Sequence, residues 1–280
     1  MGATHAALAG GLLRRGDGFL LTLDPAFQGV PETAHGGTVL AAFHLAGGAD
    51  GSAVRGVYRR RVPIATPLRL TLSPDRGRVT CVLEDDAGAL VEGSVTPPGA
   101  SHSRSSDDPV RVSAADSHPV PISRSCFACG IDNGLGLRAQ LRHDSAAVGG
   151  TWRPTASHEV AGSLAPVALT TLLDEAAFWL GVLASGESGM TTDLDVTLLE
   201  PVPFGTAITI GGRRGDVTAR ADDPRYWDTH VAAWDDGGRR VADATITFVA
   251  VRGAARRLVT GMLAMNPPDL VRLVFPTYTR

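Results

Sequence analysis

The sequence contains no lysine, although it is 280 residues long: all 26 of its basic residues are arginine. Such usage is typical of a GC-rich genome, so we expect a bacterial source. With 29 acidic residues the formal net charge is -3, and the chain therefore lacks the positive excess of a nucleic-acid-binding domain. We expect no nucleic-acid partner.

Cysteine is also scarce. Cys81, Cys126 and Cys129 are an odd number and cannot all pair within one chain, which excludes a secreted disulfide framework and favours a reducing cytosol. A secretory signal is missing as well, because Arg14 and Arg15 follow the first apolar stretch instead of preceding it. We therefore expect a cytoplasmic protein.

An uninterrupted membrane-spanning run is the third absence. The most apolar window, residues 164–184, contains Asp174 and Glu175, so it predicts a buried helix and no membrane partner.

Turn-forming residues, in contrast, are abundant. The 33 glycines and 18 prolines predict many turns and argue against a long-helix protein.

The chain divides into two lobes. Residues 98–121 are poor in large apolar side chains and rich in Ser, Asp and Pro, which predicts a linker. It separates a first lobe, residues 1–97, from a second lobe, residues 122–253, and a C-terminal tail follows at 254–280.

Two short motifs occur once in each lobe, which indicates a degenerate internal repeat. The first motif precedes an alternating strand pattern, and the second predicts a tight turn between antiparallel strands. The motif pairs are Val62-Pro63-x-x-Thr66 with Val202-Pro203-x-x-Thr206, and Asp85-Asp86-x-Gly88-x-x-Val91 with Asp235-Asp236-x-Gly238-x-x-Val241.

Each lobe has one helical candidate ahead of its strands, at residues 37–46 and 165–184. The second candidate is apolar around most of its girth, as expected for a helix wrapped by a sheet. The predicted fold class is therefore α+β, with a helix on the concave face of a curved antiparallel sheet in each lobe.

Four segments carry a family resemblance. Residues 126–137 read CFACGIDNGLGL, residues 171–176 read TLLDEA, residues 200–205 read EPVPFG, and residues 34–37 read AHGG. Together they resemble the hotdog-fold acyl-CoA thioesterases, in the branch typified by phenylacetate-pathway enzymes, built as a double hotdog. The resemblance implies hydrolysis of an acyl-CoA or acyl-carrier thioester, a small molecule, with no cofactor apart from the coenzyme A of the substrate.

The family motif is divided between the lobes. In that family a His-Gly-Gly sequence and an acid nine residues later lie on one helix. The first lobe keeps His35-Gly36-Gly37 but has His44 in the place of the acid, whereas the second keeps Asp174 but has Pro166 in the place of the first glycine. Because the family's active sites lie between two hotdogs, the resemblance implies one composite site in which His35-Gly36-Gly37 faces Asp174.

The resemblance also implies roles. The Gly36 N–H, at a helix start where backbone donors are unpaired and the helix dipole is positive, polarises the thioester carbonyl. Asp174 attacks as a nucleophile or activates a water, and Thr191 matches a hydroxyl that helps to hold this water. The candidate catalytic residues are thus Asp174, Gly36, Gly37, His35 and Thr191; Gln28, one residue from a family Gln or Asn position, is the candidate substrate-binding residue.

The opposite pairing brings His44 against Pro166. Proline has no N–H to donate, although it suits the first turn of a helix. His44 is then better interpreted as a satisfied core histidine than as a base. We expect this second interface to be inactive.

The residues alone also allow structural interpretations. Asp174 fits an exposed edge, or a buried carboxylate bonded to Thr170 or Thr171. His35 fits a structural group at a helix start better than a proton carrier. Glu175 lies about 100° around the helix from Asp174, so we expect it to be solvated or salt-bridged.

No metal site is expected from the spacing of ligands. Cys126-x-x-Cys129 offers two of the four ligands of a closed zinc site, and the sequence has no second CxxC or HxxxH, so a structural role is favoured. Gly134-x-Gly136-x-x-Ala139 matches a dinucleotide fingerprint in letters only, because no strand precedes it. The lack of GxSxG and HExxH excludes serine hydrolases and zincins.

Several points stay open. Arginines for coenzyme A phosphates are not assigned, since residues 59–61, Arg55, Arg213 and Arg214 are equal candidates. The alternative function is a non-catalytic acyl-CoA-binding protein of the same fold, and a hydratase of that fold would need an Asp and His motif that the sequence lacks. A homodimer is compatible with the sequence, which does not specify the acyl group.

Overall fold

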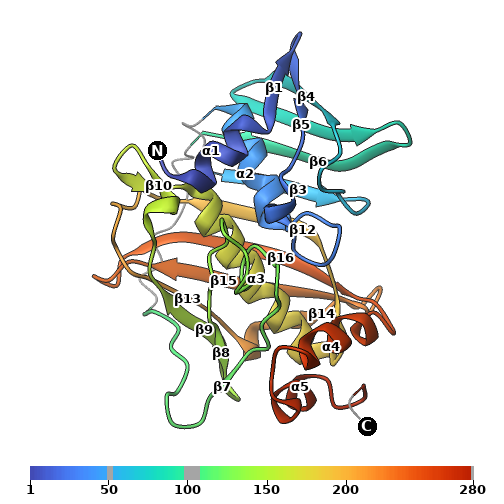
Figure 1. The fold of residues 1–280 in the computed structure, drawn as a ribbon, viewed down its shortest axis with the longest axis vertical. Helices are drawn as coiled ribbons and strands as arrows, with labels where there is room; N and C mark the ends of the chain where they lie inside the picture. The colour runs from blue at the N-terminus through green and yellow to red at the C-terminus, as the bar shows by residue number, and fades with distance from the viewer. Residues whose placement is uncertain (49–52, 98–107, 279–280) are drawn as a thin grey trace.

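The computed structural model describes residues 1–48, 53–97 and 108–278, which form two similar lobes joined edge to edge (Figure 1). In these residues one antiparallel sheet of 14 strands has the order β1-β2-β4-β5-β6-β3-β12-β16-β15-β13-β9-β8-β7, with β14 paired to β15. The first lobe contributes β1 (Leu12–Arg15), β2 (Gly18–Leu21), β3 (Ala53–Tyr58), β4 (Leu68–Asp75), β5 (Arg78–Asp85) and β6 (Gly88–Thr96).

The rest of the chain contributes the other strands of this sheet and a separate two-stranded hairpin. The sheet strands are β7 (His118–Pro119), β8 (Arg142–His143), β9 (Ala147–Trp152), β12 (Gly189–Leu198), β13 (Ile208–Arg213), β14 (Thr218–Ala219), β15 (Tyr226–Trp234) and β16 (Arg240–Ala250). The hairpin consists of β10 (Glu159–Val160) and β11 (Ser163–Leu164). The helices are α1 (Ala3–Gly10), α2 (Gly36–Gly47), α3 (Pro166–Ser185), α4 (Ala255–Leu263) and α5 (Pro268–Val274), with short 3₁₀ turns at Pro25–Phe27, Ala156–His158 and Arg214–Asp216.

The lobes meet where β3 and β12 pair antiparallel. The register runs from Val57 opposite Asp193 to Ala53 opposite Thr197, so the sheet is continuous across the junction. On either side the strand order is the same, β3-β6-β5-β4 and β12-β16-β15-β13. The predicted α+β architecture of two hotdog units is confirmed.

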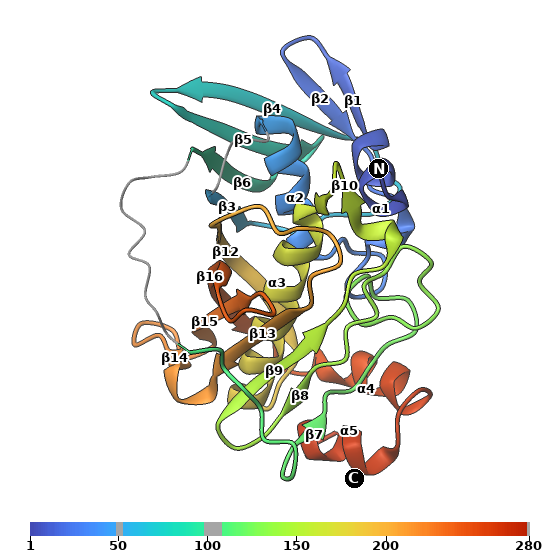
Figure 2. The same ribbon diagram turned by 90° about the vertical axis from the view of Figure 1, so that its left-hand side faces the viewer.

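The curved sheet wraps around α2 and α3 (Figure 2), whose buried faces fill the core. The helices begin within a residue of their predicted starts, and α3 opens on Pro166 at its first position, where a missing N–H costs nothing. α3 is long and apolar enough to cross a membrane, but 83% of its most apolar window is buried inside the protein. The apolar side chains around α3 therefore pack in the core, as predicted.

The repeated motifs occupy equivalent places. The carbonyl of Val62 accepts from the Ala34 N–H, and the carbonyl of Val202 accepts from the Leu164 N–H, both at 2.8 Å, two residues before α2 and α3 respectively. Each Asp-Asp-x-Gly segment turns the chain between two paired strands, β5 to β6 and β15 to β16. The repeat inferred from the sequence is therefore structural.

Two regions add to the predicted domain outline. Residues 98–107 of the predicted linker lie outside the described residues, but its end forms β7, which pairs with β8. The C-terminal tail forms α4 and α5. The side chain of Asn266, between these helices, exchanges hydrogen bonds of 2.9 and 2.8 Å with the backbone of Ile122 and so ties the tail to the second lobe.

Candidate active site

A cavity of about 330 Å³ lies between the two lobes, beside the junction of β3 and β12. Its polar wall comes from the start of α2, the middle of α3 and the Thr191 segment of β12. Its apolar wall includes Phe178, Trp179, Met190, Leu258 and Met262. The last two belong to α4, so the tail closes the apolar side of the cavity.

The start of α2 supplies an open backbone donor. His35 is the N-cap residue of this helix and is fixed by a 2.9 Å hydrogen bond from its N–H to the carbonyl of Phe27. In the described part of the chain the Gly36 N–H has no acceptor, and Gly36 lines the cavity. The Tyr58 hydroxyl donates to the Gly36 carbonyl at 2.7 Å and holds this peptide in place.

Asp174 faces that donor from α3 and is 4% exposed. Its Oδ2 lies 2.9 Å from the Gly37 nitrogen and 3.0 Å from His35 Nδ1, and its Oδ1 accepts from the Thr191 hydroxyl at 2.6 Å. Because Nδ1 carries a proton when it bonds a carboxylate, we assign the Gly37 N–H to Asp174 and not to the ring. The structure thus brings together all five predicted catalytic residues.

Glycine is required at both positions of the α2 start by close packing. A Cβ on Gly36 would lie 2.7 Å from Asp174 Oδ2, and a Cβ on Gly37 would lie 2.5 Å from the carbonyl oxygen of Thr170. The Thr170 hydroxyl donates to the Gly37 carbonyl at 2.7 Å, so it does not bond Asp174. The hydroxyl of Thr171 has no hydrogen-bond partner among the described residues. Asp174 is therefore buried, as one alternative expected, but it is neither at an exposed edge nor bonded to Thr170 or Thr171.

His35 and Asp174 shift each other's pKa in the directions that favour a charged pair. Burial lowers the pKa of His35, but the hydrogen bond and charge of Asp174, with Glu175, outweigh it and raise this pKa well above its usual value. Burial raises the pKa of Asp174, but His35, Thr191 and Gly37 outweigh it, and the net shift is downward. Burial, followed by the charge of Asp174, raises the pKa of Tyr58 well above its usual value, so this phenol stays a neutral donor.

Glu175 also belongs to the cavity wall, which the sequence did not indicate. Its Oε2 lies 3.4 Å from His35 Nε2, and its Oε1 accepts from the Trp179 indole at 3.0 Å. The prediction of a solvated side chain is wrong because Glu175 is 6% exposed, whereas its salt-bridged alternative is right. Its position between apolar residues of α3, a helix predicted to be buried, is the signal that could have indicated burial.

The Cys126-x-x-Cys129 loop reaches the same wall. Its Phe127 N–H donates to the carbonyl of Gln28 at 2.7 Å, and the rings of Phe27 and Phe127 pack edge to face at 5.1 Å. Both cysteines are free thiols that line the cavity. A hydrogen bond from Cys129 lowers the pKa of the Cys126 thiol, and that bond together with burial raises the pKa of Cys129.

Gln28 is placed differently from the other candidates. Its amide nitrogen lies 3.5 Å from the carbonyl oxygen of Ser125, and the cavity lining includes its neighbour Gly29 but not Gln28 itself. The side chain therefore supports the cysteine loop.

The arginine candidates are no longer equal. Arg59, Arg60 and Arg61 line the cavity rim, whereas the other three candidates do not. Arg59 pairs with Glu92 and Arg60 with Asp85, but Arg61 is exposed and has no ion-pair partner among the described residues. Arg61 is thus the free cation at the mouth of the cavity.

The opposite interface lacks these features. His44 is buried, and neither it nor Pro166 lines the cavity.

The Asp and His pair of a hydratase, absent as a sequence motif, does form in space between Asp174 and His35. In this pair His35 Nδ1 lies 3.0 Å from Asp174 Oδ2, and the other ring nitrogen, Nε2, lies 3.4 Å from Glu175 Oε2.

Comparisons with known proteins identify the fold. No family model and no curated protein matches the sequence. Among solved structures, the tesB protein of Mycobacterium avium subsp. paratuberculosis is 12% identical, with 89% of this chain and 98% of that chain covered and a TM-score of 0.64. A hot dog-fold protein of unknown function from Alicyclobacillus acidocaldarius is 15% identical, with 91% and 100% covered and a TM-score of 0.62.

A third similar structure has another chemistry. The dehydratase-cyclase domain in ambruticin biosynthesis is 16% identical, with 86% of this chain and 94% of that chain covered and a TM-score of 0.51. Such neighbours share an architecture but not one reaction, so the activity has to be argued from the site. The chain has the double hotdog fold.

Proposed function

We propose that the protein is a thioesterase that hydrolyses an acyl-CoA or acyl-carrier thioester at the cavity between the lobes. The observation that carries the proposal is that a buried carboxylate, Asp174, bonds the Gly37 N–H and lines the same cavity as Gly36, whose N–H is open. Thioester hydrolysis needs a negative group to attack or to activate water, and a donor for the developing oxyanion. Both are supplied here by different lobes.

The proposed roles follow from the contacts. The thioester carbonyl oxygen accepts from the Gly36 N–H, and Asp174 either attacks the carbonyl carbon or removes a proton from the attacking water. Attack by Asp174 forms an acyl anhydride, which water then hydrolyses, whereas attack by water gives the acid directly. In both routes the C–S bond breaks, and the departing thiolate takes up a proton that the water gives up. His35, Gly37 and Thr191 are positioning residues, because each holds one oxygen of the Asp174 carboxylate.

The walls of the cavity suit the two ends of such a substrate. Phe178, Trp179 and Met262 offer apolar surface to an acyl group, whereas Arg61 at the rim offers a charge to a phosphate. Gln28 and the paired arginines need no role in this arrangement.

The test is a thiol-release assay over a series of acyl-CoA chain lengths, with the Asp174→Asn protein beside the unchanged chain. Turnover that depends on Asp174 is expected. Turnover that survives unchanged in a folded Asp174→Asn protein would contradict the proposal.

A second candidate is a non-catalytic acyl-CoA-binding protein. It is favoured by one observation: three donors already occupy the two oxygens of Asp174. Under this alternative the chain binds acyl-CoA, measured by calorimetry, but releases no thiol from any ester of the series.

A further inference from the structure

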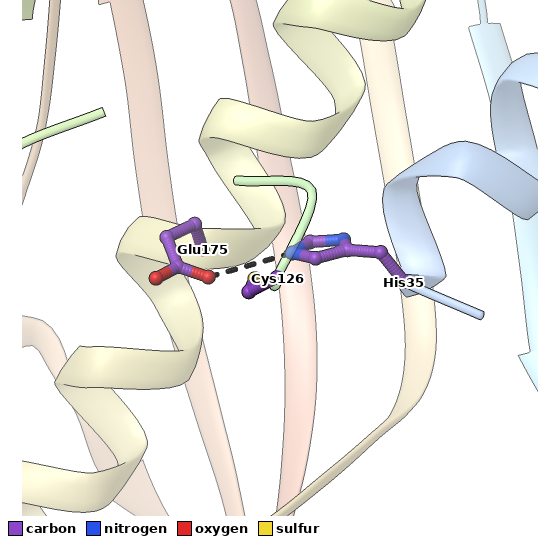
Figure 3. Close-up of side chains that lie close together, drawn as sticks. All are labelled: His35, Cys126 and Glu175. Atoms are coloured by element: carbon purple, nitrogen blue, oxygen red, sulfur yellow. Dashed lines mark hydrogen bonds and ion pairs between the residues drawn. The ribbon is translucent and has the colours of Figure 1, made fainter. Parts of the chain in front are cut away.

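Three potential metal ligands from distant segments meet in the cavity wall. Figure 3 shows His35 at the start of α2, Glu175 on α3, and Cys126 on the loop between them. One ligand atom of each lies within 4.8 Å of those of the other two, and all three residues are buried. Imidazole, thiolate and carboxylate are the ligand types that zinc takes in proteins.

The atoms that do not face the cluster centre are held by other groups. Nδ1 of His35 lies 3.0 Å from Asp174, which leaves Nε2 for the cluster. Oε1 of Glu175 accepts from the Trp179 indole at 3.0 Å, which leaves Oε2 for the cluster. This is the arrangement around zinc-binding histidines and carboxylates, whose second atoms are fixed by neighbouring hydrogen bonds.

The separation of the two free atoms also fits a shared cation. His35 Nε2 and Glu175 Oε2 are 3.4 Å apart, longer than the usual charged hydrogen bond. Two zinc bonds of about 2.0 to 2.1 Å at a tetrahedral angle place nitrogen and oxygen about 3.3 to 3.4 Å apart. The pair therefore has the spacing of two ligands of one tetrahedral ion.

The charge of the cluster adds a further reason. Asp174 and Glu175 are two buried carboxylates beside one imidazole, and in the described part of the chain no arginine pairs with either of them. Buried charge of one sign is costly unless a counter-ion is present. All three ligand residues line the cavity, which gives a cation a path of entry.

We propose that His35, Cys126 and Glu175 form a binding site for one Zn²⁺ ion, with the fourth coordination position open to the cavity. The ion binds neutral Nε2 and the Cys126 thiolate, and the protons of these groups leave to solvent. Cys129 also lines the cavity but stays outside the ligand set. The sequence argument against a metal counted only ligands that lie near one another along the chain, whereas this set spans 140 residues.

The test uses the full chain, reduced and treated with a chelator, and titrates it with Zn²⁺ in calorimetry and with Co²⁺ in absorption spectroscopy. We expect one ion per chain and a thiolate-to-cobalt charge-transfer band in the near ultraviolet. Cys126→Ser should abolish the band. It should also weaken Zn²⁺ binding by roughly 10²-fold or more, because loss of a group that only hydrogen-bonds to a metal ligand already weakens binding by up to about 10²-fold. Glu175→Gln, which keeps the side-chain shape, should weaken binding at least tenfold.

Matched controls separate the site from general thiol chemistry. Cys81→Ser changes a buried cysteine of β5 outside the cluster and should bind like the unchanged chain. Cys129→Ser should keep both the stoichiometry and the charge-transfer band. The proposal is overturned if the reduced chain binds no Zn²⁺, if folded Cys126→Ser binds it unchanged, or if Cys129→Ser alone removes the band. None of these readouts depends on thioester turnover.

Discussion

The starts of α2 and α3 occupy equivalent places in the two lobes but differ in chemistry. Before each helix the backbone makes the same hydrogen bond to a Val-Pro segment, and the N-cap residues, His35 and Ala165, have nearly the same backbone angles. After His35 the chain offers an open N–H at Gly36, whereas after Ala165 it continues with Pro166, which has none. The shared scaffold therefore carries a donor on one side only.

The residues nine positions beyond each N-cap differ in the opposite sense. α2 has His44 there, and α3 has Asp174, which crosses to the α2 start. Under the proposed function a donor and a carboxylate act only together, so one complete interface suffices. The hydrogen bond to the Val-Pro segment, present in both lobes, therefore belongs to the fold. The open N–H and the carboxylate, each present in one lobe only, belong to the proposed reaction.

The largest expected effect comes from the carboxylate. Asp174→Asn keeps the shape but removes the charge, and it should lower thioester turnover by roughly 10² to 10⁴. His44→Asn, the matched change on the other side, should leave turnover nearly unchanged. Rates of thiol release and thermal melts of both variants check this. The comparison would be reversed if the His44 variant lost activity and the Asp174 variant kept it.

The next effect concerns the donor. Gly36→Pro removes the open N–H but also adds a Cβ beside Asp174 Oδ2, so its reference is Gly36→Ala, which adds the Cβ and keeps the N–H. Relative to Gly36→Ala, loss of the donor should cost roughly 10² to 10³ in rate, the usual range for an oxyanion-hole donor. Pro166→Gly creates an N–H at the equivalent place in α3, and no activity should be gained because the position that corresponds to Asp174 is occupied by His44. Circular dichroism has to show that α2 still forms. If a folded Gly36→Pro protein is as active as the unchanged chain, the Gly36 N–H is not the donor to the thioester carbonyl.

The contrast also shows which parts the sequence could predict. Both helices and the two hairpin turns follow from periodicity and turn residues, whereas the pairing of Asp174 with the α2 start was implied by the family resemblance. Glu175 was missed because two of its neighbours, His35 and Cys126, lie on segments far from it in sequence. Leu258 and Met262 were missed because the tail has no counterpart in the repeat.

A smaller effect is expected on stability from the packing of the helix starts. Gly37→Ala places a Cβ 2.5 Å from a backbone oxygen of α3, where α3 itself has Val167 at the equivalent position. Overpacking of this kind costs roughly 1 to 3 kcal/mol of unfolding free energy. Gly261→Ala is the control, since nothing lies within 4 Å of a Cβ at that α4 position. Denaturant melts should show destabilisation for the first variant and none for the second.

The smallest effect should come from the rim. Arg61 stands just before the Val-Pro segment of the first lobe, and the equivalent residue of the second lobe is Pro201, so the rim charge is also present on one side only. Arg61 has no ion-pair partner among the described residues, and an exposed charge contact is worth roughly 0.2 to 1 kcal/mol. Arg61→Ala should therefore raise the KM for an acyl-CoA by up to about fivefold. The KM for the matching acyl-pantetheine, which lacks the nucleotide phosphates, should not change, and Arg213→Ala, outside the cavity lining, should alter neither. An equal rise for both thioesters would show that Arg61 shapes the cavity mouth and does not bind phosphate.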